Sequence, residues 1–307
     1  ILFSLGPSWN LSRPNLTSAI KSDDQTGTEG GKGNRLFSRR NLLVIGQLSL
    51  SLTLLATAGL FVRSALEAIR IDPGFRMDRE LLVEIDPSLA GYDEAQSIQV
   101  TRTMLERLRT LPQVDSASVA ATVPFGMVSL GRTLQRASDP PSDADDPSKQ
   151  DRLVSSSFNV VGTDYFATLG IPILRGREFH ENETASGAAV GADVAILDKL
   201  AAEKLWPKQD PIGQRIRLVA GNAGRASREL EVVGVVAAVR EHIVGGKPEP
   251  RVYLPFGQET PSNLHFHVAL SPQVTPGGDA EAKILETVRR ELRAVDARVP
   301  VLSLHTL

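Results

Sequence analysis

The chain contains one long apolar stretch, Leu42 to Val62, which reads LLVIGQLSLSLTLLATAGLFV without a charged residue or a proline. At about 1.5 Å rise per residue, a helix of this length is about 31 Å long, which matches the hydrocarbon core of a bilayer. Arg40 and Arg63 bound the stretch, as expected where charges reach the membrane interface. We therefore predict a transmembrane helix, which we place over residues 42–66.

Two other classes of apolar segment compete with this interpretation. A secretory signal peptide has a shorter apolar region, and it follows a short basic leader, whereas 41 residues precede Leu42 here. A buried helix of a soluble protein usually has one polar face and ends sooner. The length and composition of the stretch favour a membrane-spanning helix over both.

One sector of the predicted helix carries small side chains. At 100° per residue, this sector contains Gly46, Ser49, Thr53 and Thr57. Helices in lipid are held together by close backbone approach and by hydroxyl hydrogen bonds, because no hydrophobic force drives them together there. We therefore predict a helix-packing face at these four residues. A lone anchor helix that happens to carry small residues is the alternative.

Basic residues flank the stretch on both sides and bear on its orientation. Within about 20 residues the two sides tie at four Lys or Arg each, and within about ten residues the N-terminal side leads by four to two. The nearer charges favour a cytoplasmic N-terminal side, although charge alone does not decide the orientation.

The composition of the 307 residues is that of a folded chain of one or two domains, with 41% hydrophobic and 23% charged residues. Basic and acidic residues number 34 and 36, so the formal net charge is −2 and provides no electrostatic footprint for nucleic acid. The absence of cysteine excludes disulfides, iron–sulfur ligation and a thiol nucleophile.

The segment before the helix, residues 1–41, has the character of a connector. Ser22 to Asn34 is polar and rich in glycine, without periodicity. It is not a phosphate-binding loop, because a Walker A pattern ending at Lys32 requires Gly at position 26 and Ser or Thr at position 33. Ile1 to Gly6 is an apolar stub that is compatible with the tail of an earlier membrane helix.

The segment after the helix, residues 72–307, alternates between strand and helix patterns. Strand–helix–strand units are predicted at both ends of this segment, and a strand-richer part, about residues 152–258, lies between them. We therefore predict an α+β fold in which a transmembrane helix is followed by a split strand–helix–strand subdomain with an inserted, strand-richer second subdomain. The expected strands are 81–85, 114–123, 154–161, 194–197, 215–218, 231–239, 252–254, 265–270 and 299–304, and the expected helices are 93–110, 164–169, 198–205 and 280–295.

No residue pattern in the chain predicts catalysis. His265 and His267 would share one face of a strand, but no third metal ligand can be placed, so we interpret them as solvent-facing. Carboxylate pairs such as Glu181 with Glu183 lie in polar loops, where solvation explains them. We therefore predict no catalytic residue, no cofactor-binding residue and no metal ligand.

A set of motifs resembles a known family. The motifs are Tyr165 to Pro172 (YFATLGIP), Arg175 to Phe179 (RGREF), Leu205-Trp206-Pro207, Asp210 to Gly213 (DPIG) and Glu231 to Val236 (EVVGVV). In this order they resemble the MacB-type periplasmic core domain of ABC transporter permeases. The apolar helix followed by Asp72-Pro73-Gly74-Phe75 is similar to the middle of duplicated orphan permeases of the acidobacterial type, which carry two FtsX/MacB-like halves.

The resemblance implies a function in the bacterial inner membrane. It implies that residues 1–41 are cytoplasmic, that residues from about 67 onward are extracytoplasmic, that further membrane helices follow Leu307, and that the chain is an internal fragment. Permeases of this family perform no chemistry. A partner ABC ATPase hydrolyses ATP in the cytoplasm, and the helices transmit movement to the periplasmic domain in efflux or export. The partners implied are this ATPase, other permease helices of the same or a homologous chain, and membrane lipid. Periplasmic proteins are possible further partners. The resemblance implies no cofactor and no nucleic acid.

Two other functions remain open. The chain is also compatible with a membrane-anchored sensor or adhesion ectodomain, whose single helix only tethers it. It is compatible, too, with an envelope hydrolase whose site the sequence does not reveal. Downstream apolar segments of about 20 residues would favour the permease over the sensor. A pocket with convergent, pKa-perturbed side chains would favour the hydrolase.

Overall fold

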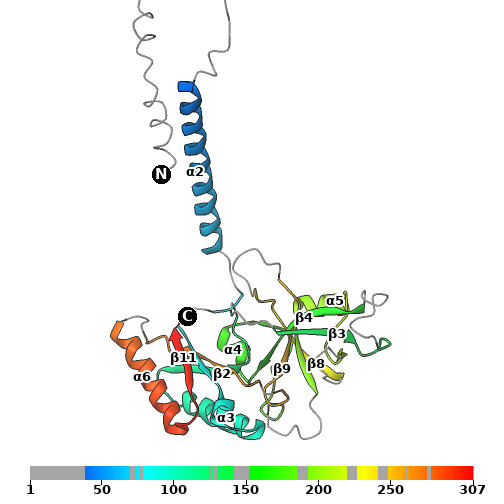
Figure 1. The fold of residues 1–307 in the computed structure, drawn as a ribbon. Helices are drawn as coiled ribbons and strands as arrows, with labels where there is room; N and C mark the ends of the chain where they lie inside the picture. The colour runs from blue at the N-terminus through cyan, green and yellow to red at the C-terminus, as the bar shows by residue number, and fades with distance from the viewer. Residues whose placement is uncertain are drawn as a thin grey trace, which may run out of the picture. The chain divides into compact units, whose positions relative to one another are not determined.

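The computed structural model describes residues 39–69, 74–76, 79–124, 126, 130–141, 152–184, 193–219, 227–240, 248–259, 261–274 and 278–306 (Figure 1). The chain divides into two compact units, Ile1–Leu66 and Glu67–Leu307. Most of the predicted connector, residues 1–38, lies outside the described residues.

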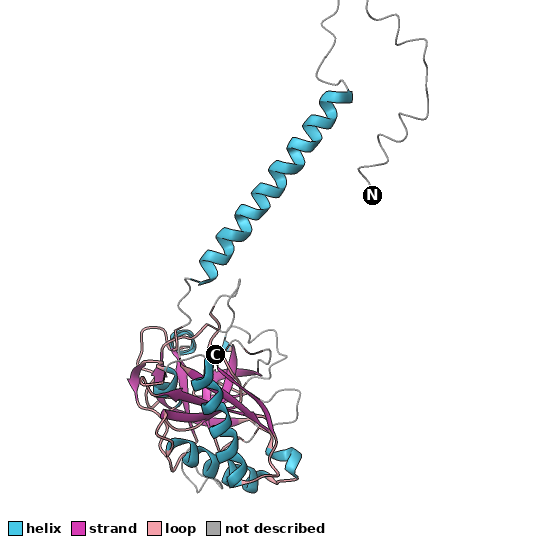
Figure 2. Ribbon diagram, turned by 90° about the vertical axis from the view of Figure 1, so that its left-hand side faces the viewer, coloured by secondary structure: helices cyan, strands magenta, loops and turns pink. Residues whose placement is uncertain are grey.

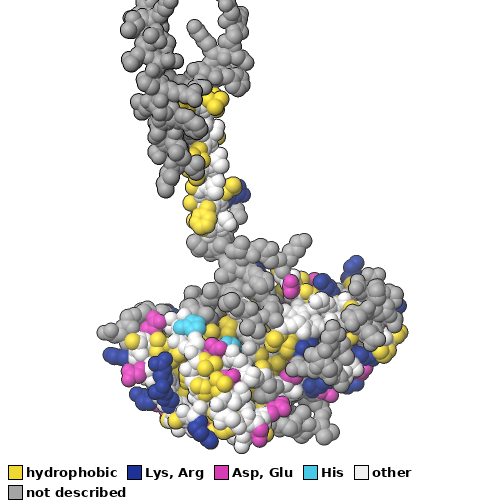
Figure 3. Space-filling model, in the orientation of Figure 1, with side chains coloured by type: hydrophobic (Ala, Val, Ile, Leu, Met, Phe, Trp, Pro, Cys, Tyr) yellow, Lys and Arg dark blue, Asp and Glu magenta, His cyan; other side chains and the backbone are white. Residues whose placement is uncertain are grey.

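The first unit contains helix α2, Arg39–Ile69, which continues by three residues into the second unit. The side chains of Leu42–Leu66 are exposed along this helix, and the space-filling view shows apolar groups on it (Figure 3). Within the described residues, α2 is the one helix long and apolar enough to cross a membrane. The helix expected over residues 42–66 is therefore confirmed as a helix.

The second unit begins and ends with strand–helix–strand units that share one sheet. Its strands are β1 (Glu80–Ile85), β2 (Val114–Ala120), β10 (Leu264–Leu270) and β11 (Val301–Thr306), in the antiparallel order β11-β1-β10-β2. Its helices are α3 (Glu94–Arg109) and α6 (Gly278–Val295), preceded by the short 3₁₀ helix η2 (Pro87–Ala90). This arrangement agrees with the predicted split subdomain.

The local sequence explains why α3 forms and which face it buries. Asp93 accepts a hydrogen bond from the Gln96 N–H, and the Gln96 side chain accepts one from the Asp93 N–H, so a capping box starts the helix. Ile98, Leu105 and Leu108 recur at helical spacing and are buried together with the β1 side chains that face the helices. One face of the four-stranded sheet is thereby sealed by α3 and α6.

The remaining strands form a closed ring. Its pairings run β4-β3-β7-β8-β6-β9 and return from β9 to β4, while β5 pairs with the end of β8 outside the ring. The strands are β3 (Leu130–Arg136), β4 (Val154–Val161), β5 (Ile173–Gly176), β6 (Val194–Asp198), β7 (Arg215–Leu218), β8 (Arg228–Val236) and β9 (Arg251–Pro255). Figure 2 shows the strands gathered together with the helices on their outside.

Two short helices accompany the ring, α4 (Tyr165–Leu169) and α5 (Lys199–Leu205). The four-stranded sheet meets the ring through one residue pair between β2 and β4, Ala120 with Val161. Helix α4 lies at this junction and contacts both β2 and β10. A second hydrophobic cluster, separate from the main core, is built around α4.

Two strands were not expected from the sequence. β3 covers residues for which no strand was predicted, and it joins the ring although it precedes residue 152. β5 contains Arg175 and Gly176, which read as part of a turn. The β3 sequence, LGRTLQR, has only two leucines among seven residues, and β5 has only four residues. Neither strand therefore shows a clear alternating pattern in the sequence.

Candidate functional site

The predicted packing face lies on α2, with its four residues on one side of the helix. A Cβ atom added at Gly46 would meet nothing within 4 Å, so that part of the face is open. The Thr53 hydroxyl donates to the Ser49 carbonyl and the Thr57 hydroxyl to the Thr53 carbonyl, each at 2.8 Å. Both threonine hydroxyl protons are used within the helix. The small side chains of this face therefore allow a neighbouring helix to approach closely, and the hydroxyl oxygens remain as hydrogen-bond acceptors. Its role in helix packing stays a prediction.

Residues 74–76, shortly after α2 in the chain, pack within the second unit. Phe75, six residues after the end of the helix, is buried in the second hydrophobic cluster. The Arg76 N–H donates to the Leu169 carbonyl at 2.6 Å. Gly74 has φ +83°, and a Cβ there would lie 3.1 Å from the Ala238 carbonyl oxygen. We call Gly74–Arg76 the exit anchor.

Helix α4, which receives the exit anchor, is packed by aromatic side chains. Tyr165 and Phe166 are fully buried, and their rings meet edge to face with centroids 5.4 Å apart. Phe166 also meets Tyr253 of β9 at 4.8 Å, and Tyr165 meets His267 of β10 at 5.5 Å. Edge-to-face contacts stabilise such clusters beyond area burial, by about 0.5–1.5 kcal/mol per pair. Because α4 lies where the ring and the four-stranded sheet meet, the exit anchor contacts the second unit at this junction.

Charged side chains hold both α4 and the loop beside it. The Glu178 carboxylate accepts from the N–H groups of Phe166 and Ala167, at 2.9 and 3.3 Å, in the first turn of α4. Burial raises the pKa of Glu178, and these backbone bonds oppose the rise. Arg177 forms a two-pronged pair with Glu183, at 2.9 and 2.7 Å. Burial alone would raise the pKa of Glu183, but its hydrogen bonds outweigh burial and lower the pKa.

The histidine pair predicted on one strand face requires a correction. His265 and His267 do lie on the same face of β10, opposite Glu84 and Leu82 of β1. His267, however, is completely buried and pairs through Nδ1 with the buried Glu80 carboxylate, so it does not face solvent. Helix α4 covers this part of the sheet, which the strand pattern alone does not reveal. His265 is half-buried; burial lowers its pKa to about 4, against the opposing effect of Glu84.

The first and last strands of the second unit lie side by side. β1 and β11 are antiparallel, and the start of β1 meets the end of β11, with Leu81 opposite Thr306. The exit anchor leads into β1, so the chain enters and leaves this sheet at the same end.

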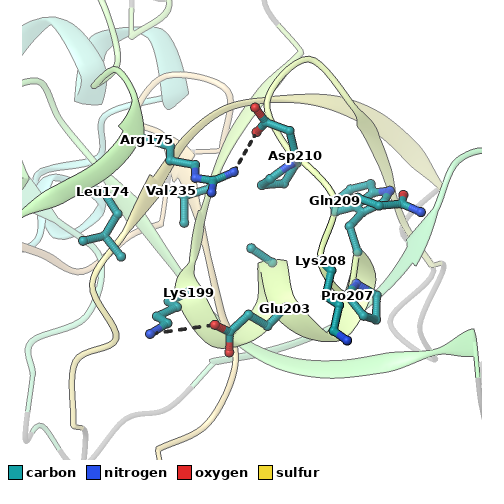
Figure 4. A pocket seen from close by; sticks show the side chains of 12 residues that line it. Leu174, Arg175, Lys199, Glu203, Pro207, Lys208, Gln209, Asp210 and Val235 are labelled. Atoms are coloured by element: carbon teal, nitrogen blue, oxygen red, sulfur yellow. Dashed lines mark ion pairs between the residues drawn. The ribbon is translucent and has the colours of Figure 1, made fainter.

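A cavity lies beside β5, α5 and the turn after α5 (Figure 4). Its volume is about 550 Å³, and its apolar lining includes Leu174, Trp206 and Val235. Two ion pairs stand on its rim, Arg175 with Asp210 at 3.5 Å and Lys199 with Glu203 at 3.8 Å. Both pairs are exposed, so they stabilise the fold little. The described residues that line the cavity include no serine, threonine, cysteine or histidine.

One buried carboxylate stands near this region. Asp198 caps α5 by accepting from the Ala201 N–H at 2.7 Å, and it accepts from the Arg251 N–H at 3.0 Å. Burial raises its pKa to about 6, and its second oxygen has no hydrogen-bond partner among the described residues. These two hydrogen bonds fix the Asp198 side chain at the end of β6, where it stabilises the start of α5 and its link to β9. No group of three or more metal-ligating side chains lies together in the described part of the chain.

Basic and acidic side chains are mixed over the visible surface of the second unit (Figure 3). No large field of one sign covers that face, in keeping with the balanced composition. The sequence did not indicate the exit anchor or the cavity as sites. The only signals for them were the Asp-Pro-Gly-Phe turn and the Leu-Trp-Pro and Asp-Pro-Ile-Gly motifs. Of these residues, Gly74 and Phe75 belong to the exit anchor, and four line the cavity: Trp206, Pro207, Asp210 and Pro211.

Comparisons with known proteins identify a family. Residues 43–289 match the sequence profile of the MacB-like periplasmic core domain. Among solved structures, the chain is similar to the periplasmic region of MacB from Actinobacillus actinomycetemcomitans, with 15% identity, TM-score 0.45, and coverage of 74% of this chain and 90% of that one. It is also similar to the extracellular domain of the noncanonical ABC-type transporter YknZ from Gram-positive bacteria, with 15% identity, TM-score 0.43, and coverage of 72% and 100%.

A third similar structure is a domain of a putative permease protein from Porphyromonas gingivalis, with 13% identity, TM-score 0.42, and coverage of 76% of this chain and 93% of that one. A comparison with curated proteins found no match.

Proposed function

Because the chain belongs to the family of MacB-like periplasmic core domains, we propose that it is part of an ABC transporter permease and couples ATP hydrolysis by a partner ATPase to movement of an extracytoplasmic domain. In this proposal the chain performs no chemistry itself. Helix α2 crosses the inner membrane, residues 1–41 lie in the cytoplasm, and residues from about 67 onward lie outside it. The acidobacterial type of duplicated permease is the arrangement we propose for the whole protein.

The exit anchor carries this proposal. Movement of a helix reaches a domain more readily when few residues separate the helix from the packed part of that domain. Phe75 is buried and the Arg76 N–H is bonded to α4, so no more than the five residues 70–74 separate the end of α2 from the buried Phe75 side chain. The connection ends at the junction between the sheet and the ring, so movement of α2 is expected to reach both.

The partners of the proposed permease follow from the same arrangement. A cytoplasmic ATPase supplies the energy, and other permease helices of the same or a homologous chain pack on α2 through Gly46, Ser49, Thr53 and Thr57. Extracytoplasmic proteins are further proposed partners, and the surface of mixed charge is compatible with binding them. The direction of transport proposed is efflux or export.

The test compares two phenylalanines of the same hydrophobic cluster. Phe75→Ala removes the side chain of the exit anchor, and Phe179→Ala removes an equally buried ring elsewhere in the cluster. Both changes are expected to cost about 3–5 kcal/mol of unfolding free energy. Only Phe75→Ala is expected to reduce the ATP-dependent change in distance between spin labels on α2 and on the domain. Phe75→Leu, which keeps most of the buried volume, is the milder variant if Phe75→Ala fails to fold.

A sensor or adhesion ectodomain remains the alternative function. It predicts that Phe75→Ala and Phe179→Ala behave alike, because a tether transmits no movement. No observation on the described residues favours this alternative over the permease.

A further inference from the structure

The strand β5 presents an unusual edge. In the described part of the chain it pairs only with β8, and all four of its residues are exposed. Ile173 and Leu174 are 40% and 48% exposed, and among the described residues outside α2 only Leu89 and Leu302 are other large aliphatic side chains with comparable exposure. Edge strands usually carry charges or lie under cover, because their free backbone groups pair with other strands. β5 carries one charge, Arg175, but it combines a free edge with two exposed apolar side chains, Ile173 and Leu174.

The cavity of about 550 Å³ lies directly beside this edge. Leu174 of β5 is part of its lining, and the opposite wall comes from α5 and the turn that follows it (Figure 4). Trp206 and Val235, both buried, supply further apolar surface. A volume of this size accommodates a large aliphatic or aromatic side chain. A strand placed along β5 would therefore have a pocket for one of its side chains.

The charges around the cavity indicate the sign of its occupant. Three cations, Arg175, Lys199 and Lys208, stand on the rim with two carboxylates, Asp210 and Glu203. Each carboxylate is already paired, with Arg175 and with Lys199, whereas Lys208 has no ion-pair partner among the described residues. The rim thus has a net positive charge and one uncompensated cation.

We propose that β5 and this cavity bind an extended, acidic segment of a partner polypeptide. The segment adds to the free edge of β5 through backbone hydrogen bonds, inserts one apolar side chain into the cavity, and places a carboxylate near Lys208. Along a strand, residues two apart share a face, so the acidic residue lies two positions from the apolar one. This inference gives the proposed extracytoplasmic domain a binding surface, and it rests on the proposed function only in placing that surface outside the cytoplasm.

The test uses synthetic peptides and the full chain in detergent, without an ATPase. The acidic probe is Thr-Glu-Thr-Leu-Thr-Glu-Thr, and its basic counterpart has Lys in place of Glu. Binding is measured by fluorescence polarisation of labelled peptide, and strand addition by hydrogen exchange of the β5 amides. The acidic probe is expected to bind at least about tenfold more tightly than the basic one and to protect the β5 amides. N-methylation of alternate probe amides, made in both registers, is expected to abolish binding in one register.

Three variants locate the binding surface. Lys208→Glu is expected to reverse the preference, so that the basic peptide binds better than the acidic one. Leu174→Ser is expected to weaken the acidic probe at least about fivefold. Leu302→Ser is the matched control, because Leu302 is also 48% exposed on an edge strand, β11, but does not line this cavity. It is expected to leave binding unchanged.

Several results would overturn the proposal. They are no binding of the acidic probe at millimolar concentration, equal binding of the acidic and basic probes, unchanged binding in Leu174→Ser, and equal binding of both N-methylated probes. Protection of β5 that grows with protein concentration in the absence of peptide would also overturn it, because the occupant would then be a second copy of the chain. None of these results bears on coupling to the ATPase, which is measured with spin labels and nucleotide.

Discussion

The Arg76 N–H donates a 2.6 Å hydrogen bond to the carbonyl of Leu169, and this bond joins the segment after α2 to the last residue of α4. Phe75, the preceding residue, is buried in the cluster that α4 organises. A backbone bond and a buried ring at neighbouring positions restrain the chain in both direction and rotation. Residues 75 and 76 are therefore part of the folded second unit.

The exit anchor should be sensitive to a single methyl group. Gly74→Ala places a Cβ 3.1 Å from the Ala238 carbonyl oxygen at a φ of +83°, so both strain and crowding result. Gly91→Ala is the control, because Gly91 has a φ of +78° but open space around the added Cβ. We expect Gly91→Ala to lower the unfolding free energy by about 1 kcal/mol and Gly74→Ala to lower it further. Equal losses in urea denaturation would show that the close approach to Ala238 does not contribute.

The pH dependence of stability should contain a contribution from Asp198. Burial raises its pKa to about 6 from 3.8, so the folded protein binds the proton more tightly than the unfolded chain. The unfolding free energy therefore falls as the pH rises from about 4 to 6. Asp198→Asn keeps an oxygen for the Ala201 and Arg251 N–H groups and should remove this fall, which is about 1–3 kcal/mol. Denaturation curves at pH 4, 5, 6 and 7 measure it, and an unchanged slope in the variant would contradict the assignment.

The buried pair of Glu80 and His267 should behave as a coupled unit. Glu80→Met leaves the buried imidazole without its partner, and His267→Leu leaves the buried carboxylate, so each single change is expected to cost about 3–5 kcal/mol. The double variant should cost much less than the sum, because no unpaired polar group remains. The half-buried Asn263–Glu84 hydrogen bond, at 2.8 Å, provides a comparison cycle with weaker coupling. Additive losses at Glu80 and His267 would be inconsistent with a direct interaction.

The face of α2 that carries small side chains can be tested with a matched pair of glycines. Gly46 and Gly59 both have open space around an added Cβ, but at 100° per residue they lie about 140° apart around the helix. Gly46→Leu should weaken co-purification or cysteine crosslinking of the permease helices, while Gly59→Leu should not. Thr53→Leu is expected to act like Gly46→Leu. If both glycine variants assemble normally, the packing face is wrong.

Local patterns allowed most helices and strands to be predicted. The apolar run of α2, the helix expected over residues 93–110 and the strand expected over residues 154–161 all follow from neighbouring residues, and the structure confirms them. The strand β3 was missed because Arg132 and Gln135 interrupt its apolar pattern, and the partners of Arg132 come from distant parts of the chain. Arg132, for example, lies over the Phe158 ring of β4, 4.0 Å from its centroid, and pairs with Glu259.

The candidate sites depend on contacts that sequence spacing does not reveal. The ring closes when β4 pairs with β9 about a hundred residues later, with Phe158 opposite Val252. His267 is buried because α4, from elsewhere in the chain, covers its strand. Phe75 reads as a turn residue, yet it occupies a cluster built from residues 120–253. In each case the decisive partner is remote in sequence, so only tertiary structure could identify the site.

The transmission of movement from α2 to the extracytoplasmic domain is the central claim, and a distance measurement tests it most directly. Spin labels at Leu66 on α2 and at Leu302 on β11 would be placed in the full permease with its ATPase in lipid nanodiscs. Electron double resonance would then compare the distance distribution with and without trapped ATP. We predict a nucleotide-dependent shift that Phe179→Ala preserves and Phe75→Ala reduces. The same distribution with and without nucleotide in the unsubstituted protein would contradict the account.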